Sequence, residues 1–255
     1  MNRVLAIALN THREAIRDRV LYSLLFFGCI VLVASLVTRE ITIGDEDKMV
    51  RGTAMGAISA FSSVMAMFLG VSLVWKELER RTIYTLASKP IPRWMFVLGK
   101  YFGLMMTLGV SLLIMAALYV LILGLGQGLP AVSFYFFLGM LFLELMLLTA
   151  WATLFSTYSG PTTATAFTLA VFVIGHLADD IWTFGQQAEG LAMRKVSAAL
   201  YWLLPNFELF NIQPEATHEL AVALPRLALA AGYGLSYTAA VLCVAVVVFS
   251  GRDFK

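Results

Sequence analysis

The sequence predicts an all-α, polytopic membrane protein, and three observations support this fold class. Of the 255 residues, 60% are hydrophobic and 13% are charged, and the mean hydropathy is +0.83. Soluble domains average about 25% charged residues. Six long runs lack charges apart from one glutamate, and a bilayer core requires about 20 apolar residues per helix. This composition excludes a soluble domain, a disordered chain and a disulfide scaffold.

The six runs predict six transmembrane helices within a single domain, residues 1–255. The predicted spans are residues 20–37, 53–75, 101–126, 131–156, 161–178 and 227–250. Continuous apolar runs favour helices over a membrane barrel, because each helix satisfies its own backbone polar groups. The short connections 127–130 and 157–160 predict tight helical hairpins on opposite sides of the membrane.

The basic residues predict the orientation of these spans. With the amino terminus inside, 12 of the 18 lysines and arginines lie in cytoplasmic segments. Because positive charge is enriched on the cytoplasmic side, both termini are predicted to be cytoplasmic. The net charge of +2 gives no reason to expect nucleic acid as a partner.

Residues 3–19 show the period of an amphipathic helix. One face is mainly apolar and consists of Leu5, Ala8, Leu9, His12, Ile16 and Val20. The pattern predicts an interfacial helix on the inner leaflet, with Arg13, Arg17 and Arg19 among anionic lipid headgroups. The alternative is a basic anchor that only sets the topology.

The second cytoplasmic segment, residues 76–100, contains a charged helical stretch and a corner with Pro90 and Pro92. Proline ends a helix but suits the first turn of the next one. A connection between neighbouring helices needs only about 2–8 residues. The segment is therefore predicted to be a docking element that consists of a helix, a rigid corner and a second helix. The alternative is that its charges only set the topology, as charges beside a span often do.

The exterior segment, residues 179–226, is the longest connection. Its apolar positions share one helical face and consist of Val196, Ala199, Leu200, Leu203 and Leu204. They predict an interfacial helix that ends at Pro205. In the first exterior loop, Asp45, Glu46 and Asp47 lack the spacing of a calcium loop and are interpreted as a solvated turn.

The chain carries no motif for nucleotide binding, and no metal or catalytic site is predicted. Its Gly99-Lys100 pair is followed by Tyr101, whereas a phosphate-binding loop requires Ser or Thr there. The strongest catalytic alternative is a lipid-modifying membrane enzyme that uses His176, Asp179 and Asp180 at the exterior face.

Glu144 is the ionisable residue well inside a span. A carboxylate there is usually paired, protonated or exposed to a cavity. It either lines a pathway or bonds a neighbouring helix, and the sequence leaves both open. The spacings Gly99-x-x-x-Gly103 and Gly52-x-x-x-Gly56 permit close helix contact.

Two motifs resemble the permease subunit of type-2 ABC exporters, particularly the six-span bacterial permeases linked to multicopper-enzyme maturation. Residues 11–19 (THREAIRDR) are similar to that family's connecting helix before the first span. Residues 77–93 (ELERRTIYTLASKPIPR), followed by Gly99-Lys100, resemble its coupling helix, with Arg81 where many members carry glycine.

The resemblance implies partners and roles for these residues. Two separate ABC ATPase subunits that bind ATP and magnesium would dock on the segment 76–100. A second copy of the permease, or a related permease, would complete the transporter in the bacterial cytoplasmic membrane. The ATPase-coupling residues would be Glu77, Glu79, Arg80, Arg81, Thr82, Ser88, Lys89, Pro90 and Arg93. An anchoring subunit that moves nothing is a further alternative.

Overall fold

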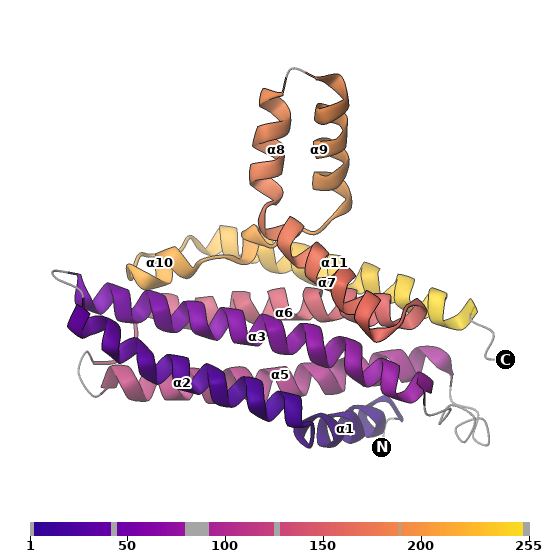
Figure 1. Ribbon diagram of the computed structural model, residues 1–255, viewed down its shortest axis with the longest axis horizontal. Helices are drawn as coiled ribbons and strands as arrows, with labels where there is room; N and C mark the ends of the chain where they lie inside the picture. Colours follow the sequence, from indigo (N-terminus) through magenta and orange to yellow (C-terminus); the bar gives the residue numbers. More distant parts are fainter. Residues whose placement is uncertain (1–2, 42–44, 80–91, 125–127, 189, 252–255) are drawn as a thin grey trace.

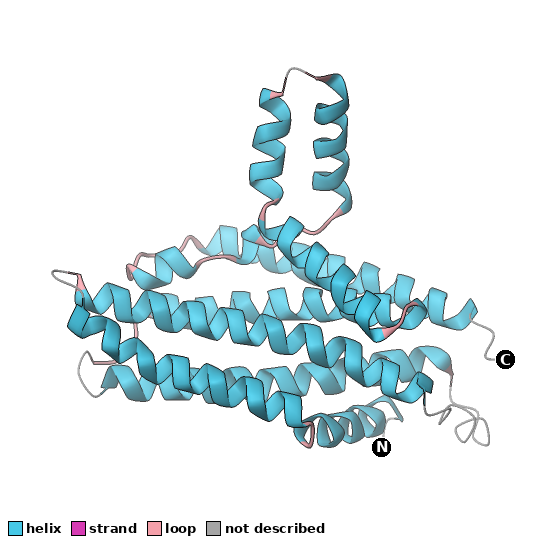
Figure 2. Cartoon of the chain, viewed as in Figure 1, coloured by secondary structure: helices cyan, strands magenta, loops and turns pink. Residues whose placement is uncertain are grey.

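The computed structural model describes residues 3–41, 45–79, 92–124, 128–188 and 190–251, and within these ranges it consists of helices and loops without a strand (Figure 2). The long helices are α2 (Arg19–Ile41), α3 (Glu46–Glu79), α5 (Arg93–Gly124), α6 (Val132–Tyr158) and α11 (Leu224–Gly251). They run along the long axis of the molecule (Figure 1). The predicted all-α fold is confirmed.

The described helices confirm a polytopic membrane protein with five or six spans. Each of the five long helices is long and apolar enough to cross a bilayer. Each also contains most or all of one predicted apolar run. The remaining predicted span, 161–178, corresponds to α7 (Pro161–His176) followed by α8 (Ala178–Gln187). These two helices meet at 62° and form a sixth span only if the bent pair is counted as one.

The break between α7 and α8 coincides with a tertiary contact at the end of α7. The backbone N–H of Phe207 donates to the carbonyl oxygen of Gly175 at 3.0 Å, so this carbonyl is used by a distant segment at the end of α7. Because Gly175 has no Cβ, the Phe207 ring and the Pro205 carbonyl can approach its backbone closely. α7 therefore ends two residues before the predicted end of the span.

Helices α8 and α9 (Leu191–Leu203) form a hairpin that projects away from the long axis of the bundle (Figure 1). The two helices pack closely where Ser197 meets Gly185, and the rings of Trp182 and Tyr201 lie 4.9 Å apart. As predicted, the second helix ends before Pro205. The 3-10 helix η1 (Glu208–Phe210) and α10 (Gln213–Thr217) then return the chain to the bundle.

The predicted acidic turn in the first exterior loop is partly helical instead. α3 begins at Glu46, so Glu46 and Asp47 occupy its first turn, where negative charge favours the helix dipole. Asp45 precedes the helix and accepts a bond from Lys48 at 2.9 Å. This hydrogen bond and the charge of Lys48 hold the pKa of Asp45 below its usual value.

The core of the bundle is centred on α6, which packs against α3, α5, α7 and α11. Leu145, Leu147 and Leu148 are fully buried there. Gly70 of α3 faces Ala152 of α6 so closely that a Cβ on Gly70 would lie 2.6 Å from the Ala152 Cβ. This packing fixes the helices that carry the polar groups described next.

Candidate functional site

Most of the predicted docking segment lies outside the described residues. α3 continues as one helix through Trp75 to Glu79, so the backbone of Glu77 and Glu79 is helical and joined directly to the preceding span. Of the predicted coupling residues, those outside the described residues are Arg80, Arg81, Thr82, Ser88, Lys89 and Pro90. Their role remains a prediction.

Arg93 is the predicted coupling residue whose side chain the structure describes, and it bonds within the chain. It is the first residue of α5, directly after Pro92. Its guanidinium donates to the carbonyl oxygens of Phe249 at 3.4 Å and Ser250 at 2.6 Å, in the last turn of α11. The last carbonyls of a helix lack intrahelical partners and carry partial negative charge. Arg93 therefore joins the start of α5 to the end of α11.

The predicted amphipathic helix is α1 (Arg3–Ile16), and it packs against α5. A Cβ on Gly99 would lie 2.7 Å from Ile7 Cβ, and one on Gly103 would lie 2.5 Å from the Ala8 carbonyl oxygen and the Thr11 Cβ. The close contact permitted by the Gly99-x-x-x-Gly103 spacing is confirmed. The buried stripe of α1 is thus Ala8, Thr11 and Ala15, and this smaller face meets protein.

Two polar contacts reinforce the joint between α1 and α5. The Lys100 ammonium, 2% exposed, donates to a carboxylate oxygen of Glu14 at 3.3 Å, and His12 Nδ1 lies 2.9 Å from the Thr107 hydroxyl. The predicted interfacial arginines, Arg13, Arg17 and Arg19, are all exposed. Their contact with lipid headgroups remains a prediction. Figure 1 shows α1, the start of α5 and the end of α11 at the same end of the bundle.

A second cluster of polar side chains lies inside the bundle, around Glu144. Its carboxylate is 5% exposed, and one oxygen lies 3.6 Å from Nε2 of His176 on α7. The hydroxyl of Ser63 on α3 faces the same carboxyl without closing a hydrogen bond to any described residue. His176 also stacks on the Phe207 ring, with centroids 5.5 Å apart. Glu144 thus meets a neighbouring helix and also faces open space.

This open space is a cavity of about 140 Å³. Its lining comes from α3, α6, α7, η1 and α10 and consists of Ser59, Phe137, Leu141, Glu144, His176, Phe210, Asn211 and Gln213. Polar groups within a membrane-spanning bundle are uncommon, and they normally bond one another or face water. Glu144 therefore lies beside a residue of a neighbouring helix and on the wall of a cavity, and its role in lining a pathway or bonding that helix remains a prediction.

Helix α10 lies at the end of the bundle opposite to α1 (Figure 1), and its first residue, Gln213, lines the cavity. Gly52 and Gly56 of α3 face Thr217 and Gln213, so the second glycine spacing also marks a helix contact. Gln213 Nε2 donates to the Gly52 carbonyl oxygen at 3.4 Å. Arg51, 15% exposed, forms an ion pair of 2.7 Å with Glu219 just beyond α10.

The pairing of Glu144 with His176 was missed by the sequence reasoning, which treated the two residues separately. A signal was nevertheless present. Gly160, in the tight turn between α6 and α7, lies sixteen residues after Glu144 and sixteen residues before His176. In an antiparallel helical hairpin, positions at equal distances from the turn lie at the same height, because both helices rise about 1.5 Å per residue.

The residues of the catalytic alternative do not form one site. His176 turns to Glu144, whereas Asp179 accepts a bond of 2.9 Å from Asn206 and so fixes the segment that follows α9. Asp180 is exposed on α8. Among the described residues, no three His, Cys, Asp or Glu side chains are grouped so as to hold a metal ion.

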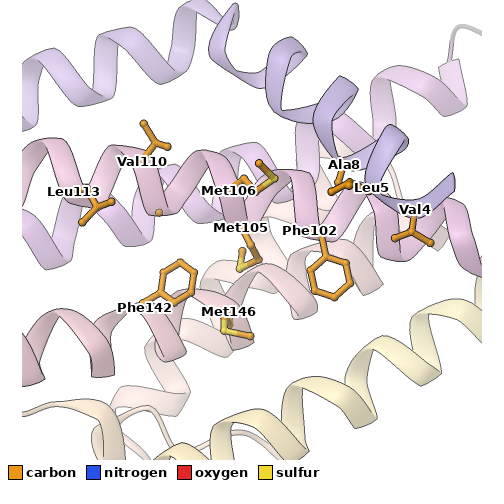
Figure 3. Close-up of a pocket in the computed structure, with 11 residues that line it drawn as sticks. Val4, Leu5, Ala8, Phe102, Met105, Met106, Val110, Leu113, Phe142 and Met146 are labelled. Atoms are coloured by element: carbon orange, nitrogen blue, oxygen red, sulfur yellow. The ribbon is translucent and has the colours of Figure 1, made fainter. Parts of the chain in front are cut away.

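A larger groove of about 720 Å³ lies on the side of the bundle, between α1, α5 and α6 (Figure 3). Its lining side chains are all apolar and include Phe102, Met106, Phe142 and Met146. Such a surface offers no hydrogen bonds and is compatible with hydrocarbon chains.

The sequence matches the family model described as ABC-2 family transporter protein over residues 5–254. The chain belongs to this family. It is therefore an ABC-2 type permease, a transmembrane subunit of a transporter, as the resemblance predicted, while the link to multicopper-enzyme maturation remains a prediction. No match was found among curated proteins. The permease family and the five or six spans together make the chain a multi-pass membrane protein.

Proposed function

We propose that this permease is the membrane subunit of an ATP-driven exporter in the bacterial cytoplasmic membrane. Two copies form the pathway, and two separately encoded ATPase subunits, which hold ATP and magnesium, dock on the segment 76–100. The match to the ABC-2 family over residues 5–254 is the observation that carries this proposal. The excess of basic residues in the segments predicted to be cytoplasmic supports placing the segment 76–100 on the cytoplasmic side, where the ATPases would dock.

The joints at the α1 end of the bundle support a mechanical role for the segment 76–100. This segment connects α3 to α5, and the start of α5 is bonded to α11 through Arg93 and to α1 through Lys100. A displacement of the segment when the ATPases close on ATP is therefore passed to three helices at once. Discrete rearrangements of packed helices are a common way to transmit such a motion.

Charge reversal of Arg80 and Arg81 tests this proposal. The double variant Arg80→Glu/Arg81→Glu should reduce co-purification of the ATPase subunits at least tenfold, because charge complementarity at a docking surface is replaced by repulsion. Transport into membrane vesicles should fall in parallel. Insertion of the permease into the membrane should be unchanged.

The matched control is Arg194→Glu/Lys195→Glu, which reverses two adjacent charges on the exposed face of α9. This control should retain ATPase binding and stimulated ATP hydrolysis. Equal ATPase binding by the Arg80/Arg81 variant and the wild type would contradict docking on the segment 76–100.

A further inference from the structure

The cavity beside Glu144 contains a buried acceptor without a donor. One carboxylate oxygen of Glu144 has no hydrogen-bond partner among the described residues, although the side chain is only 5% exposed. Nε2 of His176 lies 3.6 Å from this carboxylate, beyond hydrogen-bond distance. Buried polar groups without a partner are costly and rare. The site is therefore incomplete without an added group.

The tautomer of His176 identifies what is missing. Its Nδ1 lies 3.0 Å from the carbonyl oxygen of Phe172. A carbonyl oxygen only accepts, so the hydrogen of a neutral ring is assigned to Nδ1 and the lone pair to Nε2. Nε2 faces the Glu144 carboxylate. The ionised carboxylate of Glu144 and the Nε2 lone pair are then both acceptors, and a hydrogen-bond donor placed between them satisfies both.

The other lining groups are also suited to a cation. Asn211 uses its amide N–H on Glu208 at 3.0 Å, and Gln213 uses its amide N–H on Gly52 at 3.4 Å, which leaves the Gln213 amide oxygen as its acceptor. The rings of Phe137 and Phe210 complete the wall. Aromatic faces attract cations. A volume of about 140 Å³ admits a small organic ion.

We propose that this cavity binds a compact primary ammonium ion. Its N–H groups donate to Glu144 and to His176 Nε2, and its short apolar part lies against the two phenylalanine rings. The ammonium belongs either to a free alkylamine or to the headgroup of a lipid. The inference goes beyond the proposed coupling to ATPases and does not depend on it.

Calorimetry on the purified full-length permease in detergent tests this inference. Ethylammonium chloride should bind saturably, and tetramethylammonium chloride, which carries the same charge without N–H donors, should bind at least tenfold more weakly at equal ionic strength. Glu144→Gln should weaken ethylammonium binding at least tenfold, because the new amide both removes the charge and donates to His176. Asp180→Asn, which neutralises an exposed carboxylate outside the cavity, should bind like the wild type.

The source of the ammonium is distinguished in nanodiscs. If a lipid headgroup occupies the cavity, ethylammonium binding should be weaker in phosphatidylethanolamine than in phosphatidylcholine. Equal binding in both identifies a free amine as the ligand, and either result supports the site. Indistinguishable binding of the two cations by the wild type overturns the proposal, even if Glu144→Gln fails to fold, and so does wild-type affinity in a folded Glu144→Gln variant.

Discussion

Two buried acid–base pairs in this permease lie in contrasting surroundings. At the α1 end of the bundle, Lys100 is 2% exposed and its partner Glu14 is 35% exposed, so the pair joins the protein interior to its surface. Inside the bundle, Glu144 is 5% exposed and His176 is 30% exposed, and their 3.6 Å separation leaves a donor missing. The first pair belongs to a close helix joint, and the second borders a cavity.

The neighbours of each pair strengthen the contrast. Gly99 and Gly103 let α1 rest directly on α5 beside Lys100. Beside Glu144, by contrast, the hydroxyl of Ser63 on α3 is buried without a partner among the described residues. Tight packing specifies a single arrangement, whereas unsatisfied polar groups permit several. The α1 joint is therefore suited to transmit force, and the polar groups around the cavity are suited to change their hydrogen-bond partners.

The largest effect is expected at the α1 joint. Gly103→Ala should destabilise the permease by about 2 kcal/mol, because overpacking a close contact forces the backbones apart. A Cβ there would lie 2.5 Å from the Ala8 carbonyl oxygen. The free energy of unfolding in mixed detergent micelles measures the loss.

Gly139→Ala on α6 is the matched control, since nothing lies within 4 Å of a Cβ at that position. Alanine is the better helix former, so this variant should be neutral or more stable by up to about 1 kcal/mol. Equal destabilisation by both substitutions would contradict the close packing of α1 on α5.

An intermediate effect is expected from breaking the Lys100–Glu14 pair, and its size should depend on which partner is removed. Glu14→Ala takes the carboxylate from a nearly inaccessible ammonium and should cost about 1–1.5 kcal/mol. Lys100→Met keeps the volume and leaves a carboxylate that water can reach, so it should cost less. The two unfolding free energies decide the order, and a greater loss for Lys100→Met would contradict the burial of the ammonium.

The spans were predictable because a long uncharged run is stable in few environments besides the hydrocarbon core of a bilayer. Five long helices confirm this, including α3 and α5, which extend beyond their apolar runs into polar flanks. The bend after His176 was not predictable in the same way. It depends on the bond from Phe207 to Gly175, a contact between segments thirty-two residues apart that hydropathy does not register.

The candidate site was predicted in its parts and not in its assembly. The glycine spacing at Gly99 and Gly103 indicated a close contact, but the periodicity of residues 3–19 did not identify α5 as the partner. Glu144 was singled out because a lone carboxylate within a span is costly. The cavity beside it depends on α10 folding back over α3, which is a tertiary contact without a sequence period.

The smallest effect on stability is expected at the Glu144–His176 pair. Glu144→Gln should change the free energy of unfolding by less than about 1 kcal/mol, because losing a weak contact is offset by removing a charge that is costly inside a membrane. A double-mutant cycle with His176→Phe should give a coupling energy below about 1 kcal/mol, as is typical of polar pairs within membranes. The same cycle for Lys100→Met and Glu14→Ala should give a larger coupling. A stronger coupling at Glu144 than at Lys100 would contradict this prediction and identify the Glu144–His176 pair as a structural bond between α6 and α7.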